Sequence, residues 1–350
     1  MKYWNDTLRE MEEYIPGEQP EENAKIIKLN TNENPFPPSK NALDLMMKQV
    51  NENLRLYPDP MATRLREIFA EQNKLQSNQV FAGNGSDEIF TLIFRGFANK
   101  NSLAAFPYPS YSLYDTLAQG NGIPYEKVQL EEGFEYNLDK FLKKKYNLVI
   151  IANPNNPTGT FCPIEQIESF CKRFEGLFVV DEAYIDFYGG SAIELVNKFD
   201  NLIVTRSMSK SYSLAGLRVG FAAANADIIR GFMKIKDSYN LDSLAQAGAC
   251  ASLLDQKTFD YNKRMLLISK EYLEERLAEI DFQIIPSRAN FIFVKHPQIS
   301  AEDLYNSLKE RGILVRYFSG ERKNEYVRIS IGKLDEVKKL CKEIDEIISE

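Results

Sequence analysis

The chain has 350 residues, a length that favours two domains, each able to bury its own core. Hydrophobic residues make up 44% and aromatic residues 12% of the chain, so its composition is that of a globular protein and excludes a disordered one. The formal net charge of −7, from 43 basic and 50 acidic residues, argues against a general nucleic-acid-binding surface.

Neither targeting nor metal binding is indicated by the sequence. The first twenty residues carry acidic side chains throughout, unlike a signal or transit peptide, and no run approaches the ~20 apolar residues of a membrane span. The four cysteines form no CxxC pair, and His296 is the single histidine. We therefore expect a cytoplasmic protein with reduced cysteines that binds no metal, membrane or nucleic acid.

The first part of the chain predicts an arm followed by a large α/β domain. Residues 1–30 contain prolines and no strand-helix alternation, so they are expected to pack on the small domain or on a partner subunit. From about Met61 to Asn225, short apolar runs alternate with helical patterns, which is typical of a mainly parallel sheet covered by helices, and we expect this domain to span residues 31–242. Helices are predicted at 62–75 and 86–98, and strands at 79–83, 102–106, 147–153, 177–184, 201–207 and 219–225. Their unbroken apolar character fits burial on both faces.

The pattern changes after about Ser243. A long amphipathic helix is predicted at 258–279, and a charged helix ends the chain at 333–349. Between them lie two apolar strand-like runs at 282–286 and 290–295 and a helix at 301–311. These elements predict a smaller α+β domain over residues 243–350.

Hydroxyl side chains crowd around one lysine just after a buried strand. Residues 207–220 read SMSKSYSLAGLRVG, with Lys210 at the fourth position and Arg218 eight residues later. A lysine that forms a Schiff base must be desolvated so that its amine is partly neutral, and a phosphate needs hydroxyl donors and a fixed cation. The segment provides both, although a polar surface loop would contain the same residue types.

Polar side chains also follow two other predicted strands. Asp181 ends the run LFVVD, with Tyr184 three residues later, and Asn156 lies in the turn NPNNPTG. The carboxyl ends of parallel strands are where such sheets bind ligands. A carboxylate there can keep a pyridine nitrogen protonated, and an amide can donate to a cofactor oxygen. Taken singly, the same residues also fit a metal ligand, a helix cap or a plain turn.

The motif GNGSDE (83–88) follows a predicted strand and opens a helix, so its backbone amides form an anion site. The third glycine of the dinucleotide fingerprint is absent, which favours phosphate binding over a nicotinamide cofactor. An ordinary capped helix start is the alternative explanation.

In this order, these motifs resemble those of the fold-type I enzymes of the aspartate aminotransferase superfamily, which use pyridoxal 5′-phosphate. The resemblance covers essentially the whole chain and is strongest to the histidinol-phosphate aminotransferases, a class-II aminotransferase group. The motifs that carry it are LNTNENPFPPS (29–39), LRLYPDP (54–60), GNGSDE, PYPSYSLY (107–114), NPNNPTG, VVDEAY (179–184), the lysine segment and RISIG (328–332). It implies a mainly parallel seven-stranded sheet in the large domain.

The resemblance also implies roles for individual residues. Lys210 becomes the Schiff-base lysine, Asp181 the partner of the pyridine nitrogen, and Tyr184 a third catalytic residue. The further cofactor contacts implied are Asn156 with Tyr184 at the ring oxygen, Tyr111 stacked on the ring, and Ser86, Asp87, Ser207, Ser209 and Arg218 around the phosphate. Tyr57 corresponds to a tyrosine that reaches the phosphate from the neighbouring subunit, which implies a homodimer.

For the substrate, the resemblance makes Arg328 the residue that grips a carboxylate and places Arg316 and Tyr14 at a substrate phosphate, with Asn156 beside them. Arg322 and Lys323 lie in the same segment, and which of these cations face the cavity stays open. The implied reaction converts histidinol phosphate and 2-oxoglutarate to imidazole acetol phosphate and glutamate, in histidine biosynthesis. A related aminotransferase acting on another phosphorylated or aromatic substrate, or a decarboxylase of threonine phosphate, would share nearly all these motifs.

Overall fold

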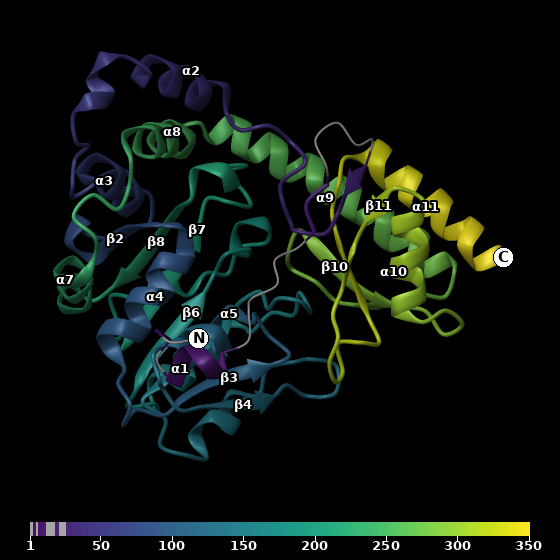
Figure 1. Cartoon of the computed structure of the whole chain (residues 1–350), viewed down its shortest axis with the longest axis horizontal. Coiled ribbons are helices and arrows are strands. Elements are labelled where there is room, and N and C mark those ends of the chain that lie inside the picture. The colour runs from purple at the N-terminus through teal and green to yellow at the C-terminus, as the bar shows by residue number, and fades with distance from the viewer. Residues whose placement is uncertain (1–2, 5, 12–17, 21–25) are drawn as a thin grey trace.

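The computed structural model describes residues 3–4, 6–11, 18–20 and 26–350. They form a larger body around a central sheet and a smaller one, and α9 runs from the first into the second (Figure 1). The helices are α1 (Asp6–Glu10), α2 (Lys40–Gln49), α3 (Thr63–Gln72), α4 (Gly85–Phe97), α5 (Leu113–Gly120), α6 (Ile164–Cys171), α7 (Ala226–Ile235), α8 (Ser243–Leu254), α9 (Gln256–Glu279), α10 (Ala301–Glu310) and α11 (Leu334–Ser349). None of the described helices is both long and apolar enough to cross a membrane.

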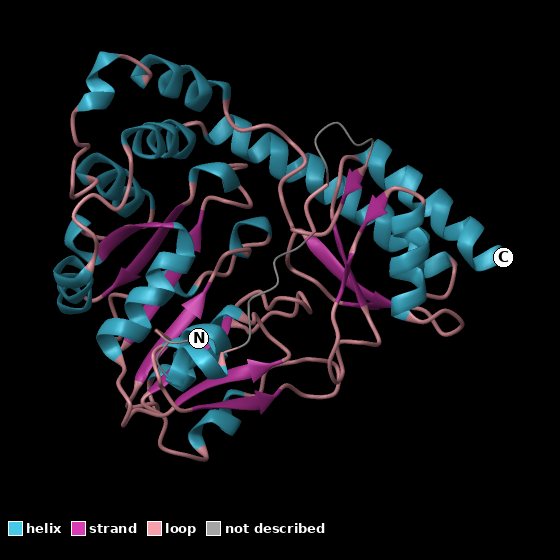
Figure 2. Cartoon of the chain, in the orientation of Figure 1, coloured by secondary structure: helices cyan, strands magenta, loops and turns pink. Residues whose placement is uncertain are grey.

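The central sheet has seven strands in the order β2-β8-β7-β6-β5-β3-β4. Figure 2 shows the strands in magenta, with the helices around them in cyan. The strands are β2 (Val80–Asn84), β3 (Ala104–Tyr108), β4 (Tyr125–Gln129), β5 (Leu148–Ala152), β6 (Leu177–Asp181), β7 (Leu202–Ser207) and β8 (Val219–Ala224). Only β8 runs antiparallel to its neighbours, β2 and β7, and the other pairs are parallel. The predicted α/β fold with a mainly parallel seven-stranded sheet is confirmed.

Alternate side chains of the central strands enter two separate cores. In β5, Val149 and Ile151 pack into the core that contains residues of α3, α6 and α8. Leu148 and Ile150 pack into the opposite core, with residues of α4, α5 and α7. Successive side chains of a strand point to opposite faces, so a sheet covered by helices on both sides requires apolar residues at every position. This explains the unbroken apolar runs in the sequence.

Each strand predicted for the larger body forms within a few residues of its expected position. The edge strand β4 was not predicted from the residues because its sequence, YEKVQ, is mostly polar and its side chains are exposed or only half-buried. The helices α2 and α8 were not predicted either. They pack so closely that a Cβ atom on Gly248 would lie 2.8 Å from the Met46 sulfur.

The smaller body contains an antiparallel sheet in the order β12-β13-β10-β9, packed with α9, α10 and α11. Its strands are β9 (Gln283–Ile285), β10 (Phe291–Lys295), β12 (Arg316–Tyr317) and β13 (Val327–Ser330). A separate pair joins β1 (Ile27–Lys28) to β11 (Ile313–Leu314) in parallel and so holds the N-terminal segment against this body. The strands β11, β12 and β13 were not predicted.

The division into residues 1–30, 31–242 and 243–350 stays a prediction. One observation bears on the boundary near residue 243. Ala245, Ala249 and Leu253 of α8 are buried in a core of the larger body, although the sequence pattern changes before them.

The connections of the larger body contain short 3₁₀ helices. These are η1 (Glu52–Arg55), η2 (Ser77–Gln79), η3 (Leu138–Leu142), η4 (Ile185–Phe187), η5 (Ala192–Leu195) and η6 (Ala215–Leu217).

Candidate active site

A cavity of about 340 Å³ lies where the carboxyl ends of β5, β6 and β7 face the smaller body. The sequence-predicted site residues that line it are Ser86, Asp87, Tyr111, Asn156, Asp181, Tyr184, Ser207, Ser209, Lys210, Arg218, Arg316 and Arg328. Tyr57 does not line it, and Tyr14 lies outside the described residues. The fold therefore gathers into one cavity residues that are more than two hundred positions apart in sequence.

Asp181, the last residue of β6, is 6% exposed. Its carboxylate accepts hydrogen bonds from Tyr114 Oη at 2.6 Å, from Thr205 Oγ1 at 3.2 Å and from the backbone nitrogen of Ala183 at 3.2 Å. Burial raises the pKa of Asp181 to about 6, and these hydrogen bonds oppose the rise. A buried carboxylate held in this way is stabilised by a cationic partner, such as a protonated ring nitrogen.

The sequence analysis identified Asp181 but not Tyr114 and Thr205, which donate hydrogen bonds to its carboxylate. Tyr114 is fully buried on α5. Its burial and the nearby Asp181 charge raise the pKa of its hydroxyl well above the usual value, so the hydroxyl stays a hydrogen-bond donor. A tyrosine in an otherwise apolar helix face needs a partner for its hydroxyl, and that need was a usable signal. Thr205 interrupts the apolar strand LIVT and is also fully buried.

Lys210 lies in the turn after β7, and its Nζ donates to the carbonyl oxygen of Thr31 at 3.0 Å. Burial, together with the charges of Arg328 and Arg218, lowers the pKa of Lys210 to about 8, although the Glu33 charge opposes the shift. About half of the lysine is then neutral near pH 8. A neutral amine is the form that attacks a carbonyl carbon, so this environment suits a nucleophile.

One end of the cavity fits a phosphate monoester. Ser86 and Asp87 belong to the first turn of α4, whose backbone amides lack partners within the helix. Arg218 donates to Asp87 Oδ2 at 2.8 Å and to Ser209 Oγ at 3.4 Å. Gly85 adopts a φ of +74°, and a Cβ atom there would lie 2.6 Å from Arg218 Nη2. Glycine at this position therefore lets the guanidinium approach the start of the helix.

The opposite side of the cavity carries the smaller body's cations. Arg328, on β13, is 7% exposed and donates to Asn156 Oδ1 and to the carbonyl oxygen of Asn30, both at 2.6 Å. Arg316 and Lys323 line the same cavity. Arg322 instead donates to backbone carbonyls of residues 130–132. Among the cations left open by the sequence, Arg316 and Lys323 face the cavity.

Asn30, Thr31 and Asn32 form part of the cavity wall and were not predicted as site residues. Asn32 Nδ2 donates to Tyr184 Oη at 3.1 Å, and Ser330 Oγ donates to Asn32 Oδ1 at 2.7 Å. The segment was noticed only as part of the motif LNTNENP. The polar residues at its start link Tyr184 to the smaller body.

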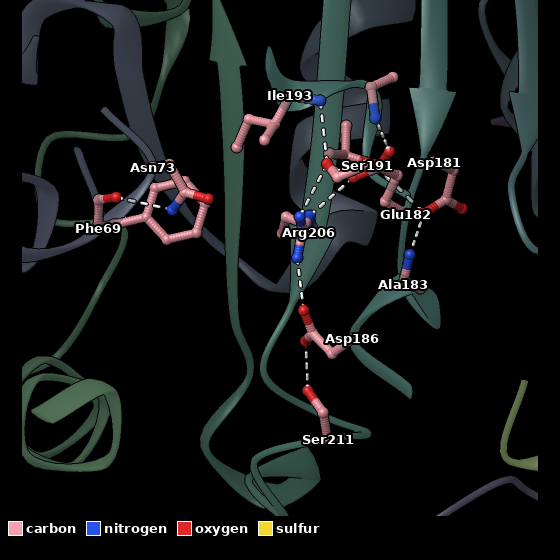
Figure 3. Close-up of polar contacts among 12 residues, drawn as sticks. Phe69, Asn73, Asp181, Glu182, Ala183, Asp186, Ser191, Ile193, Arg206 and Ser211 are labelled. Carbon is pink, nitrogen blue, oxygen red and sulfur yellow. Dashed lines mark hydrogen bonds and ion pairs between the residues drawn. The ribbon is translucent and has the colours of Figure 1, made fainter. Parts of the chain in front are cut away.

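A buried ionic network joins residues that follow Asp181 to Arg206 of β7 (Figure 3). Arg206 Nε donates to Glu182 Oε2 at 2.8 Å, and Arg206 Nη1 pairs with Asp186. Asp186 Oδ2 in turn accepts a hydrogen bond from Ser211 Oγ at 2.5 Å. Burial raises the pKa of Glu182, and the Arg206 charge opposes that rise. The network connects Glu182, the residue after Asp181, with Ser211, the residue after Lys210. It therefore helps to fix the positions of Asp181 and Lys210 relative to each other.

Removing one member of this network should destabilise the protein. We expect Asp186→Ala to lower the free energy of unfolding by roughly 3 kcal/mol, because it leaves Arg206 buried with one carboxylate fewer. Ser211→Ala removes a single hydrogen bond and should cost about 1 kcal/mol. Denaturant unfolding of both variants measures these differences. An Asp186→Ala protein as stable as the wild type would show that the network contributes nothing.

Comparison with known proteins identifies the family. The chain belongs to the aminotransferase class I and II family, whose model matches residues 24–344. It is 43% identical over 352 aligned residues to a histidinol-phosphate aminotransferase of Clostridium beijerinckii, covering 99% of this chain and 98% of that one.

Solved structures share the fold at lower identity. The histidinol-phosphate aminotransferase from Sinorhizobium meliloti in complex with pyridoxal-5′-phosphate has a TM-score of 0.90 at 23% identity, covering 100% of this chain and 98% of that one. The L-threonine-O-3-phosphate decarboxylase from Porphyromonas gingivalis has a TM-score of 0.81 at 22% identity, covering 93% and 100%. The fold alone therefore does not distinguish transamination from decarboxylation.

Proposed function

We propose that this chain is a pyridoxal-phosphate-dependent aminotransferase that converts histidinol phosphate and 2-oxoglutarate to imidazole acetol phosphate and glutamate, in histidine biosynthesis. The observation that carries the proposal is the 43% identity to a histidinol-phosphate aminotransferase over 99% of this chain. The cavity supports it, because a partly neutral lysine, a buried carboxylate and a phosphate-sized anion site face the same space.

The residues present fit the proposed cofactor. When bound, it supplies an electron-accepting ring that stabilises negative charge at the substrate carbon. Lys210 would hold its carbonyl carbon, and Asp181 would keep its ring nitrogen protonated. Its phosphate would be held by the first-turn amides of α4 with Ser207, Ser209 and Arg218. Tyr111 would stack on the ring, and Asn156 and Tyr184 would bond the ring oxygen.

Lys210 has a second role when the amino substrate displaces it. Its released amine then takes a proton from the substrate carbon bonded to nitrogen, as a general base. A pKa of about 8 suits this task, because the base must be partly unprotonated near neutral pH. Asn156 and Arg328, joined by a 2.6 Å hydrogen bond, orient the substrate beside this amine.

Two differently charged substrates must use the one cavity. Glutamate offers a carboxylate where histidinol phosphate offers none, and histidinol phosphate carries a phosphate. Arginine can bond either anion in a bidentate manner, so Arg328 serves the carboxylate and Arg316 the phosphate. Tyr14 lies outside the described residues and stays a predicted contact of the substrate phosphate.

An assay of two separate mixtures tests the proposal. Purified enzyme loaded with cofactor is incubated with histidinol phosphate plus 2-oxoglutarate, and separately with threonine phosphate or serine phosphate alone. We expect glutamate in the first mixture. Carbon dioxide from the second mixture, without glutamate in the first, would establish the decarboxylase instead. Glutamate formed only from aromatic or other phosphorylated donors would establish a related aminotransferase.

We propose also that the active unit is a homodimer. Large apolar side chains lie exposed from α2 to residue 61, namely Leu43, Met47, Val50, Leu54, Leu56, Tyr57 and Met61. Tyr57 is 79% exposed and stacks on Tyr239 with ring centres 4.1 Å apart, away from the cavity of its own chain. Coverage of this surface by a second copy would bury it and bring Tyr57 to the neighbouring cofactor phosphate.

Complementation between two inactive chains tests this arrangement. A Lys210→Ala chain mixed with a Tyr57→Ala chain should recover activity, because one of the two sites in the mixed dimer carries both intact residues. The expected recovery is roughly a quarter of wild-type activity when the chains exchange at random, which follows from the isologous symmetry of the dimer. Mixed dimers, proven by differently tagged chains, that show no recovery would contradict a shared site.

We propose also that the protein resides in the cytoplasm. Cys162, Cys171, Cys250 and Cys341 are all free thiols, and burial raises the pKa of Cys162 and Cys171 to about 12. Unpaired, unreactive cysteines are typical of a reducing compartment. Recovery of the protein in a membrane or extracellular fraction of the producing cell would contradict this part.

A further inference from the structure

Three cations surround one aromatic ring on the cavity wall. The guanidinium carbons of Arg316 and Arg328 lie 5.4 Å and 5.3 Å from the centre of the Phe318 ring. The Nζ atom of Lys323 lies 6.0 Å from the same point. All four side chains line the cavity. The cluster is therefore a concentrated positive region, facing the space that the proposed substrates enter.

Lys323 is held in place by its own loop. The Lys323 backbone nitrogen donates to the carbonyl oxygen of Gly320 at 3.2 Å, and Gly320 has a φ of +106°. The two residues before Lys323 are anchored as well. Arg322 Nη1 donates to the carbonyl oxygen of Leu130 at 2.9 Å, and Tyr108 Oη donates to the carbonyl oxygen of Glu321 at 3.1 Å. These anchors fix where the Lys323 side chain leaves the backbone.

The ammonium group of Lys323 forms no direct ion pair within the part of the chain that the structure describes. It lies 5.5 Å from the centre of the Tyr108 ring, as does Lys127. Lys127, however, pairs with Asp115 at 2.6 Å. Burial lowers the pKa of Lys323 and the Lys127 charge lowers it further, although the Asp115 charge opposes the shift. An anion in the cavity would offset both effects.

Arg328 and Lys323 have different charged neighbours. The charge of Arg328 is the largest electrostatic influence on the pKa of Lys210. For Lys323, the leading charged neighbours are Lys127 and Asp115. Arg328 thus acts most strongly on Lys210, whereas Lys323 lies beside Lys127 at the Tyr108 ring.

We propose that Lys323 is a specificity-determining residue whose ammonium group contacts the phosphate of the amino donor in the cavity, beside the Phe318 ring. A phosphate monoester carries up to two negative charges near neutral pH, whereas each carboxylate of glutamate carries one. The third cation therefore favours the phosphorylated donor over glutamate. This inference rests on the proposed function.

Three variants test the role of Lys323 in the cofactor-loaded enzyme. Lys323→Met removes the charge and keeps the length of the side chain, and Lys323→Arg keeps a charge. Lys342→Met, on the exposed face of α11, measures the general effect of losing one lysine. For each variant, kcat and KM are measured with histidinol phosphate and with glutamate, and inorganic phosphate is tested as an inhibitor of the glutamate reaction.

We expect Lys323→Met to raise the KM for histidinol phosphate and the inhibition constant of inorganic phosphate about tenfold, with the KM for glutamate changed by less than about twofold. Lys323→Arg should stay within about threefold of the wild type for all three constants, because it keeps the charge. Lys342→Met should match the wild type.

Equal changes for both substrates, or unchanged constants in a folded Lys323→Met protein that retains its cofactor, would overturn the role of Lys323. The phosphate measurement does not depend on histidinol phosphate. A wild-type enzyme that rejects histidinol phosphate would therefore refute the proposed function, while weaker phosphate inhibition in Lys323→Met alone would still support the anion contact.

Discussion

Replacing Lys210 by alanine should lower kcat by at least about a thousandfold, because the change removes both the nucleophile that holds the cofactor and the general base. Steady-state assays of glutamate formation measure the loss. Added methylamine should restore part of the activity, since a small free amine can enter the space left by the side chain and accept the proton.

Covalent labelling provides the control for this variant. Borohydride should fix the cofactor onto the peptide that contains Lys210 in the wild-type protein, and peptide mapping identifies the labelled residue. The Lys210→Ala protein should take up no label. Wild-type turnover in the variant, or a label on another lysine of the wild-type protein, would show that Lys210 is not the nucleophile.

Asp181→Asn should lower kcat by roughly a hundred- to a thousandfold while the protein still binds its cofactor, because an amide cannot keep the ring nitrogen protonated. The amide keeps the size of the carboxylate and can still accept the hydrogen bond of Tyr114, so the cavity should persist. Cofactor absorbance and kcat, measured on the same sample, separate the two effects. Unchanged turnover would remove Asp181 from the mechanism.

The same variant should be more stable than the wild type in the cofactor-free form. Burial raises the pKa of Asp181 from 3.8 to about 6, so the folded state favours the protonated carboxyl. The stability that this group contributes is present below about pH 4 and is lost as the pH rises to about 6. Urea unfolding should therefore show Asp181→Asn to be more stable by roughly 1–3 kcal/mol at pH 7.5, with little difference at pH 4. Equal stability at both values would contradict a costly buried charge.

The sequence located the reacting residues because they follow buried strands. Asp181 and Lys210 come directly after apolar runs, and the carboxyl ends of neighbouring parallel strands meet at one edge of a sheet. Their supports could not be predicted in the same way. The hydrogen bond from Tyr114 to Asp181 joins residues 67 positions apart, and it depends on how α5 packs against the sheet.

The substrate side of the cavity was less predictable for a related reason. Arg322 and Lys323 are adjacent, yet only Lys323 faces the cavity. The turn at Gly320, together with the carbonyl groups of residues 130–132 that bind the Arg322 guanidinium, determines which of the two side chains faces the cavity. Strand β13, which carries Arg328, was missed because Arg328 and Ser330 alternate with its apolar residues, so it lacks the unbroken apolar run by which β9 and β10 were predicted.

Transfer of nitrogen tests the central claim most directly. Histidinol phosphate labelled with ¹⁵N at its amino group is incubated with the cofactor-loaded enzyme and unlabelled 2-oxoglutarate, and the glutamate is analysed by mass spectrometry. We predict ¹⁵N-labelled glutamate in amounts equal to the imidazole acetol phosphate formed, and none with Lys210→Ala. Histidinol phosphate that remains unconsumed by a cofactor-loaded enzyme, with no label in glutamate, would contradict it.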